Sequence, residues 1–264
     1  MFKKVISAVI IAGILVTLSS CAGIQQKKEG EKKSSDAYYG LGVQYLSEGD
    51  YQRALLELRK AETFQMKDPR IHNTMGLVYY FTERYEEAEK EYRKAISQDK
   101  NYSEAYVNLG TLYARQDKYT EAIEQYKKAL KNPFYATPTK ALHNIGLSYQ
   151  KMGNTKKAVS ALQKAIQQDP AQIRPYFDLG RLYYRENRME DAIKIFGQAI
   201  RRHPRIEEDP INTLSLAHLH NWLALSYFKN SDSENAVIHF REVERLSSDS
   251  KLSEEASKYL DLLR

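Results

Sequence analysis

The chain has 264 residues and a formal net charge of +6, with 40 basic and 34 acidic side chains. A mixed surface of this kind does not by itself indicate a nucleic-acid-binding protein, and an apolar content of 42% is ordinary for a folded domain. A single cysteine excludes an internal disulfide, so the stability of the fold must come from packing.

The N-terminus has the layout of a secretory signal. Lys3 and Lys4 precede an apolar run from Val5 to Leu18, and small residues follow it. As a helix this run measures roughly 21 Å, which is too short for a hydrocarbon core of about 30 Å. We therefore expect a signal peptide over residues 1–20. Its removal takes away two lysines and leaves a net charge of +6 − 2 = +4.

The sequence Leu18-Ser19-Ser20-Cys21 resembles a bacterial lipobox. This resemblance implies cleavage before Cys21, acylation of Cys21, and a membrane anchor formed by several acyl chains. The alternative is an uncleaved anchor with an incidental cysteine. Ala22 in the next position implies sorting to the periplasmic face of the bacterial outer membrane. Residues 21–35 are otherwise polar and charged, which predicts a flexible tether behind the lipidated cysteine.

A repeat of about 34 residues follows the tether. Short glycine-containing segments such as MGLVYY (75–80) and LGRLYY (179–184) recur along the chain. The recurring residues are Gly42, Gly76, Gly110, Gly146, Gly180 and Ala224. Alanine recurs 12 residues after each of them, at Ala54, Ala88, Ala122, Ala158, Ala192 and Ala236. Small residues let paired helices approach, and we expect the large residues between them, such as Tyr92 and Phe196, to fill the gap to the next repeat.

This pattern is similar to the tetratricopeptide repeat, a pair of antiparallel helices per unit. It predicts an all-α fold, a right-handed superhelical solenoid of six tetratricopeptide repeats over residues 36–250. Asp169-Pro170 and His203-Pro204 should end second helices, since proline cannot continue a helix. Leu252, Ala256 and Tyr259 recur at helical spacing and predict a C-terminal capping helix over residues 251–264.

Motifs for catalysis or cofactor binding are missing from the sequence. It contains no P-loop, no dinucleotide-binding glycine motif, no nucleophile elbow and no HExxH. His218 and His220 are two residues apart on a predicted helix and point in different directions, which is unsuitable for sharing a metal ion. We expect no enzyme, no cofactor, no metal, and neither a nucleic acid nor a small-molecule substrate as partner.

Repeats of this kind act by presenting a surface, and in the family the first helices line a concave groove. Helical spacing from the motif glycines projects two groups of side chains into it. The first group is apolar and belongs to repeats one and two; we call it the apolar face: Tyr39, Val43, Leu46, Leu77, Tyr80 and Phe81. A hydrophobic partner segment would suit this face, although inter-repeat packing alone would explain some of its members.

The second group, the basic face, belongs to later repeats: Arg115, Lys151, Arg181 and Arg185. Lys140 and Arg174 extend it, and Asp178 is the nearest counter-charge. An acidic or amide-rich partner segment would suit this face, and solvated charge is an almost equally good interpretation. The first repeat has Tyr39 and Val43 where repeats that grip chaperone C-termini carry lysine and asparagine, so that clamp is absent.

The lipobox, the tether, six repeats and the segment NPFYATPTKALHNIGLSYQKMGN (132–154) together resemble the type IV pilus biogenesis and stability lipoproteins, the pilotins. The resemblance implies a protein on the outer membrane that helps the pilus secretin to reach it and multimerise. An expansion near residues 205–217 departs from the repeat period. The alternative is a lipoprotein adaptor for cell-wall enzymes or another envelope complex, which would need the same anchor and groove.

Overall fold

The computed structural model describes residues 25, 27–65, 67–202, 210–247 and 249–264. The predicted signal peptide, Cys21 and residues 203–209 of the expansion lie outside these residues. The chain divides into two compact units after Leu112, within helix α5 (Ser103–Arg115).

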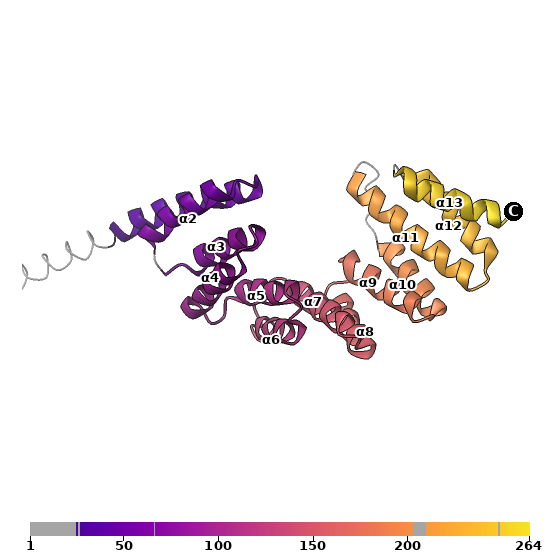
Figure 1. Ribbon diagram of the computed structural model, residues 1–264, viewed down its shortest axis with the longest axis horizontal. Helices are drawn as coiled ribbons and strands as arrows, with labels where there is room; N and C mark the ends of the chain where they lie inside the picture. Colours follow the sequence, from indigo (N-terminus) through magenta and orange to yellow (C-terminus); the bar gives the residue numbers. More distant parts are fainter. Residues whose placement is uncertain (1–24, 26, 66, 203–209, 248) are drawn as a thin grey trace, which may run out of the picture. The chain divides into compact units, whose positions relative to one another are not determined.

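Unit 1 consists of helices joined by short turns (Figure 1). An N-terminal helix includes residues 27–47 and pairs with α2 (Tyr51–Phe64) as repeat one. Repeat two is formed by α3 (Pro69–Phe81) and α4 (Tyr85–Gln98), which contact each other closely. The first residues of α5 complete the unit.

The N-terminal helix extends into the segment where we expected a flexible tether, so that prediction is wrong for residues 27–35. Most of these residues are lysine and glutamate, which are good helix formers, and Glu29 and Lys33 are spaced to face each other. Ser35 is buried, and its hydroxyl donates a hydrogen bond of 3.0 Å to the carbonyl of Ala61 in α2. This contact fixes the helix onto repeat one before residue 36.

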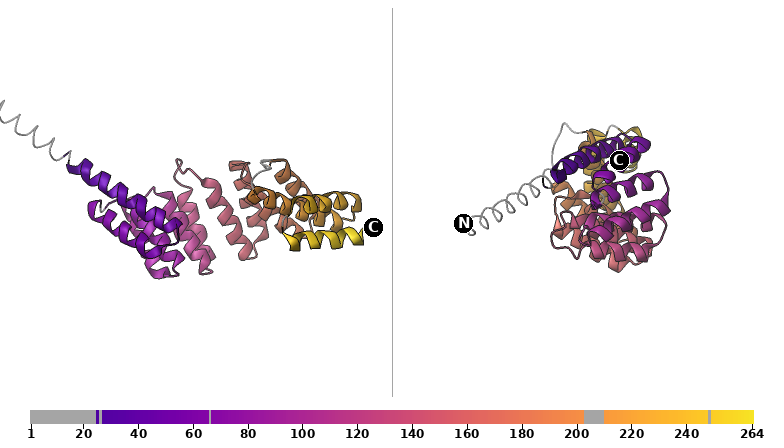
Figure 2. Two further views of the ribbon diagram at one scale, coloured as in Figure 1. Left: turned by 90° about the horizontal axis from the view of Figure 1, so that it is seen from above. Right: turned by 90° about the vertical axis from the view of Figure 1, so that its left-hand side faces the viewer.

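Unit 2 continues the same plan (Figures 1 and 2). Its helices are α6 (Tyr119–Ala129), α7 (Pro138–Lys151), α8 (Thr155–Gln168), α9 (Ile173–Arg185), α10 (Met189–Arg202), α11 (Pro210–Lys229), α12 (Ser233–Leu246) and α13 (Ser250–Leu262). From α6 onward, each helix contacts the next one in the chain. As predicted, α8 ends directly before the Asp169-Pro170 pair, while the His203-Pro204 pair lies outside the described residues.

The turn inside each repeat uses one residue in the left-handed region of backbone space. These residues are Gly49, Glu83, Asp117, Gly153, Asn187 and Ser231. In each case the next residue donates its N–H to a tyrosine carbonyl in the preceding helix; Arg84, for example, bonds Tyr79 at 2.8 Å. This closes the first helix and fixes the direction of the second. Aspartate and asparagine side chains then cap several helix starts, as Asp50 does for α2 and Asn154 for α8.

The motif glycines are required by close packing inside each repeat. A Cβ built on Gly76 would lie 2.5 Å from Tyr92 Cε1, and one built on Gly180 would lie 2.5 Å from Phe196 Cε1. The large residues therefore pack directly on the glycine of their own repeat. Phe196 also reaches the next repeat, as the spacing predicts, because its ring stacks on Trp222 of α11 with centroids 6.3 Å apart.

Helix α13 covers the end of repeat six, as expected of a capping helix. Leu252 and Ala256 are buried, and the Tyr259 ring stacks on Phe240 with centroids 4.9 Å apart and planes 2° from parallel. Among the helices that the structure describes, none is long and apolar enough to cross a membrane.

Candidate protein-binding surfaces

The six residues of the apolar face lie on adjacent first helices, three on the N-terminal helix and three on α3. Contacts between these helices bring the two groups to neighbouring positions: the Arg70 guanidinium bonds Asp36 at 2.7 Å, and Thr74 donates to the Tyr39 hydroxyl at 3.4 Å. The two groups therefore belong to one surface of unit 1.

Members of the apolar face differ in how much they are already engaged. The Tyr39 ring lies under the Arg70 guanidinium, 5.0 Å from its centre, so this side chain helps to join repeats one and two. Leu46, Leu77 and Tyr80 are half-buried. Val43 is 39% exposed and Phe81 is 53% exposed. The Phe81 ring stacks on Tyr51 of α2 at 6.3 Å, which holds it in place at the surface. Val43 and Phe81 are thus the residues available to a partner.

Three further large apolar side chains of unit 1 are exposed, Leu41, Leu56 and Phe64, and sequence reasoning singled out none of them. Leu41 precedes the motif glycine of repeat one and is 41% exposed. The residues in the same position of the later repeats are all buried: Met75, Leu109, Ile145, Leu179 and Leu223. Those side chains pack on the preceding repeat, and no helix of the described residues takes that place for Leu41. The repeat alignment could have predicted the exposure of Leu41, because Leu41 belongs to the first repeat of the alignment.

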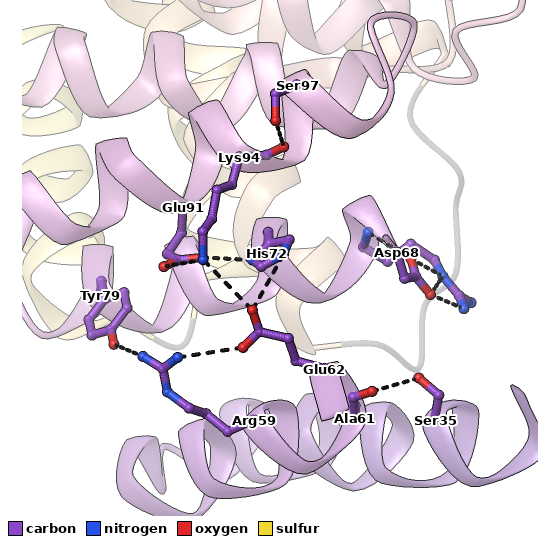
Figure 3. A network of polar contacts seen from close by, with 11 residues as sticks. Ser35, Arg59, Ala61, Glu62, Asp68, His72, Tyr79, Glu91, Lys94 and Ser97 are labelled. Carbon is purple, nitrogen blue, oxygen red and sulfur yellow. Dashed lines mark hydrogen bonds and ion pairs between the residues drawn. The ribbon is translucent and has the colours of Figure 1, made fainter. Parts of the chain in front are cut away.

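A buried polar network lies at the junction of repeats one and two (Figure 3). His72 of α3 is at its centre, almost completely buried, with Nδ1 2.8 Å from Glu91 Oε2 and Nε2 3.7 Å from Glu62 Oε1. Lys94 approaches both carboxylates, at 3.6 Å from Glu91 and 3.7 Å from Glu62. On the far side of Glu62, Arg59 donates to the Tyr79 hydroxyl at 3.3 Å (Figure 3).

The network joins three helices, α2, α3 and α4, and α3 also carries Leu77, Tyr80 and Phe81 of the apolar face. Burial raises the pKa of the Glu91 carboxyl, but the hydrogen bond from His72 and the charge of Lys94 outweigh this, so that its pKa lies below the ordinary value. Since His72 is inaccessible to a substrate, the arrangement serves to position the helices. Sequence reasoning missed it because its members are far apart along the chain.

The basic face is less uniform than its sequence suggests. Lys151 and Arg185 are exposed at the ends of α7 and α9, and Arg115 is exposed at the end of α5. Arg181 differs, because its guanidinium lies over the rings of Phe177, at 5.6 Å, and Trp222, at 5.3 Å. Stacking of this kind fixes the plane of an arginine and orients its edge for a carboxylate.

Asp178, the expected counter-charge of the basic face, is paired instead with a histidine. Its Oδ2 atom lies 2.7 Å from His143 Nε2, which joins α9 to α7. Among the described residues, no ion pair connects Lys151, Arg181 or Arg185 to a carboxylate. Within the described residues, the charges of Lys151, Arg181 and Arg185 are therefore not balanced by a direct ion pair.

Comparisons with known proteins identify the class first. Two family models described as "Tetratricopeptide repeat" match residues 68–132 and 149–209. Together with the helix pairs, the recurring turns and the glycine packing, they show that the chain is an all-α tetratricopeptide-repeat scaffold, a fold that serves protein interaction. No curated protein matches its sequence.

Several solved structures are similar to this chain in fold. PilF from Pseudomonas aeruginosa shares 22% identity at a TM-score of 0.67, covering 87% of this chain and 99% of that one. PilW, described as a widely conserved type IV pilus biogenesis factor, shares 20% sequence identity at a TM-score of 0.67. The match covers 84% of this chain and 97% of PilW. YrrB, a repeat protein described as having an unusual peptide-binding site, shares 20% sequence identity at a TM-score of 0.55. The match covers 76% of this chain and 97% of YrrB. At these identities the likeness is one of fold.

Proposed function

We propose that the protein is a non-enzymatic, lipid-anchored scaffold of the bacterial outer membrane that assists the pilus secretin in reaching the membrane and multimerising. Its apolar face carries this proposal. Val43 and Phe81 are exposed on adjacent first helices of unit 1, and exposed apolar side chains that gather on a folded protein suit contact with a partner. The similarity of the fold to PilW, a type IV pilus biogenesis factor, supports the choice of partner.

The mechanism joins the anchor to the apolar face. Acyl chains on Cys21 would hold the repeats close to the membrane and so raise the effective concentration of a partner segment there. The apolar face would cover exposed apolar surface of a secretin subunit until neighbouring subunits replace it. Because the polar network of His72, Glu91 and Glu62 fixes the helices below, the surface needs little rearrangement to bind.

The test measures heat-resistant secretin multimers in outer membranes, in a strain that makes a secretin. With the double variant Val43→Asp/Phe81→Asp we expect multimers to fall to the level of a strain lacking the protein, while secretin monomer persists. The matched control is Ile238→Asp/Leu262→Asp, which places the same charges on exposed apolar positions of α12 and α13. Normal multimers in the apolar-face variant, present at normal amount, would contradict the proposal.

The anchor is tested separately. Cys21→Ser should move the protein from the membrane fraction to the soluble periplasmic fraction without changing its circular dichroism spectrum. If multimers remain unchanged even when the protein is deleted, the secretin role fails. The wall-enzyme adaptor then becomes the candidate, and its partners would be sought by affinity capture.

A further inference from the structure

The connection between α6 and α7 in unit 2 presents an aromatic side chain to solvent. Phe134 is 91% exposed, far more than any other large apolar residue that the structure describes. Burying a phenylalanine stabilises a fold, and this fold leaves Phe134 outside its core. Its position is nevertheless fixed. Asn132 Oδ1 accepts the N–H of Phe134 at 2.9 Å, and the next residue, Tyr135, is buried. The connection is therefore ordered with its aromatic ring pointing outward.

A pocket begins two residues after Phe134. It has a volume of about 660 Å³ and lies between residues 136–140, α7, the turn before α9 and the first residues of α9. Pockets that bind ligands have volumes of this order. Two residues of chain span at most roughly 7 Å, so the backbone of Phe134 lies within about that distance of the first residue that lines the pocket, Ala136.

The charges around this surface are predominantly positive. Lys140 and Arg174 line the pocket, and within the described residues neither is joined to a carboxylate. One carboxylate, Asp169, also lines the pocket, and its Oδ1 accepts the N–H of Ala171 at 3.0 Å; Asp178 of α9 is paired with His143 at 2.7 Å. Exposed lysines at the end of α6 and in the connection add to the positive potential: Lys127, Lys128 and Lys131.

We propose that Phe134 and the adjacent pocket of unit 2 form a second docking surface, which takes an extended acidic segment of a partner protein. Carboxylates of the segment pair with Lys140 and Arg174, while Phe134 packs on an apolar side chain beside them. A protein segment suits this surface better than a membrane, because a flat bilayer leaves a concave pocket of 660 Å³ unfilled. The inference rests on the proposed scaffold function and adds the chemistry of a second contact.

The experiment selects binders from a random dodecapeptide phage library on the full chain. We expect selected peptides to be enriched in aspartate and glutamate next to an apolar residue. The best peptide is then measured by fluorescence anisotropy beside a twin in which asparagine and glutamine replace the acidic residues. We expect the twin to bind at least about tenfold more weakly, and the acidic peptide to weaken as salt is raised.

Variants locate the binding. Lys140→Glu/Arg174→Glu should weaken the acidic peptide at least about tenfold, and Phe134→Ser about fivefold. The matched controls are Lys156→Glu/Lys164→Glu on α8 and Leu262→Ser on α13, which make two charge reversals and one loss of an apolar side chain at other exposed positions and should leave affinity unchanged. Equal binding of the peptide and its twin, selection of no peptide, or unchanged binding by the pocket variants would overturn the inference.

Two further readouts separate the alternatives. Sedimentation with phosphatidylglycerol vesicles that depends on Phe134, without binding of acidic peptides, would assign the surface to lipid and overturn the protein assignment. Failure of the docking-surface proposal can be distinguished from failure of the proposed secretin function. Acidic peptides can bind unit 2 whether or not secretin multimers depend on the protein, and the apolar-face variant can abolish multimers whether or not unit 2 binds peptides.

Discussion

Repeats two and six place different chemistry in the same two positions. In repeat two, His72 and Glu91 are 19 residues apart and form a buried pair at 2.8 Å. In repeat six, His220 and His239 have the same separation, and their Nδ1 atoms are 3.0 Å apart. One repeat thus joins a histidine to a carboxylate, and the other joins two imidazoles.

The difference shows that the repeat fold brings these two positions together in both repeats. The residue types at the two positions then decide the charge of the pair. The His72–Glu91 pair extends through Glu62 and Lys94 into the neighbouring repeat. The two imidazoles can share a hydrogen bond only when one donates and the other accepts, so the accepting ring must be neutral and the two rings cannot both be charged. Burial, with the adjacent His239, lowers the pKa of His220 to about 4, and burial also lowers that of His239. We therefore expect the stability of repeat six to depend on pH through its two histidines.

The largest contrast between the two repeats concerns their motif residue, glycine in repeat two and alanine in repeat six. Gly76→Ala would bring Cβ within 2.5 Å of the buried Tyr92 ring, and we expect a loss of about 2–3 kcal/mol in the free energy of unfolding. Ala224→Gly adds only backbone freedom and should lose about 1 kcal/mol. Urea unfolding followed by circular dichroism compares them. Equal losses would mean that repeat two has no tighter packing.

Acidification should weaken repeat six next most strongly. The pKa of His220 in the folded chain lies below its unfolded value of 6.5, so the unfolded state binds a proton first and stability falls below about pH 6.5. At about pH 5 the loss is about 2 kcal/mol relative to pH 7.5. Glu242 opposes this shift in His220, and Arg245 adds to it.

Trp222 provides the measurement, because it is the only tryptophan of the chain and packs on Phe177, Tyr184 and Phe196 around α9 to α11. Its fluorescence during urea unfolding reports the stability of this region at each pH. The double variant His220→Gln/His239→Gln has no imidazoles to titrate there and should lose most of the pH dependence. An unchanged pH dependence in that variant would assign the effect to other groups.

Breaking the pair of repeat two should have a smaller effect. Glu91→Gln retains the shape of the side chain but removes the charge that His72 and Lys94 face, and we expect a loss of about 1–2 kcal/mol in unfolding free energy at neutral pH. Because the pKa of Glu91 is lowered, its contribution is present above its unfolded pKa and declines only as pH falls below that value. Urea unfolding of the variant and the parent at neutral pH measures the loss; no difference would show that the pair adds nothing net.

The smallest expected effect comes from making repeat six resemble repeat two. His239→Glu would give His220 a carboxylate partner, which favours its charged form, so that acidification no longer penalises the folded state. At about pH 5 we expect the variant to be about 1 kcal/mol more stable than the parent, measured again by Trp222 fluorescence. A variant less stable than the parent at this pH would show that the two positions are not equivalent.

Local sequence was sufficient for the repeat architecture. Small residues at fixed spacing, such as Gly76 and Ala88, specify where two helices approach, and a proline such as Pro170 specifies where a helix ends. Such constraints act within a few turns of helix, so that a single sequence carries them. The same reasoning placed Val43 and Phe81 on a surface and Arg181 on another.

Contacts between distant residues were decided only by the tertiary structure. Leu41 is exposed and Met75 is buried although both precede a motif glycine, because burial depends on whether a neighbouring helix covers that face. The extension of the first helix through Ser35 depends on a carbonyl 26 residues away. The exposure of Phe134 likewise follows from the burial of Tyr135 beside it, and no periodicity in the sequence distinguishes which of two adjacent aromatic side chains the fold will bury.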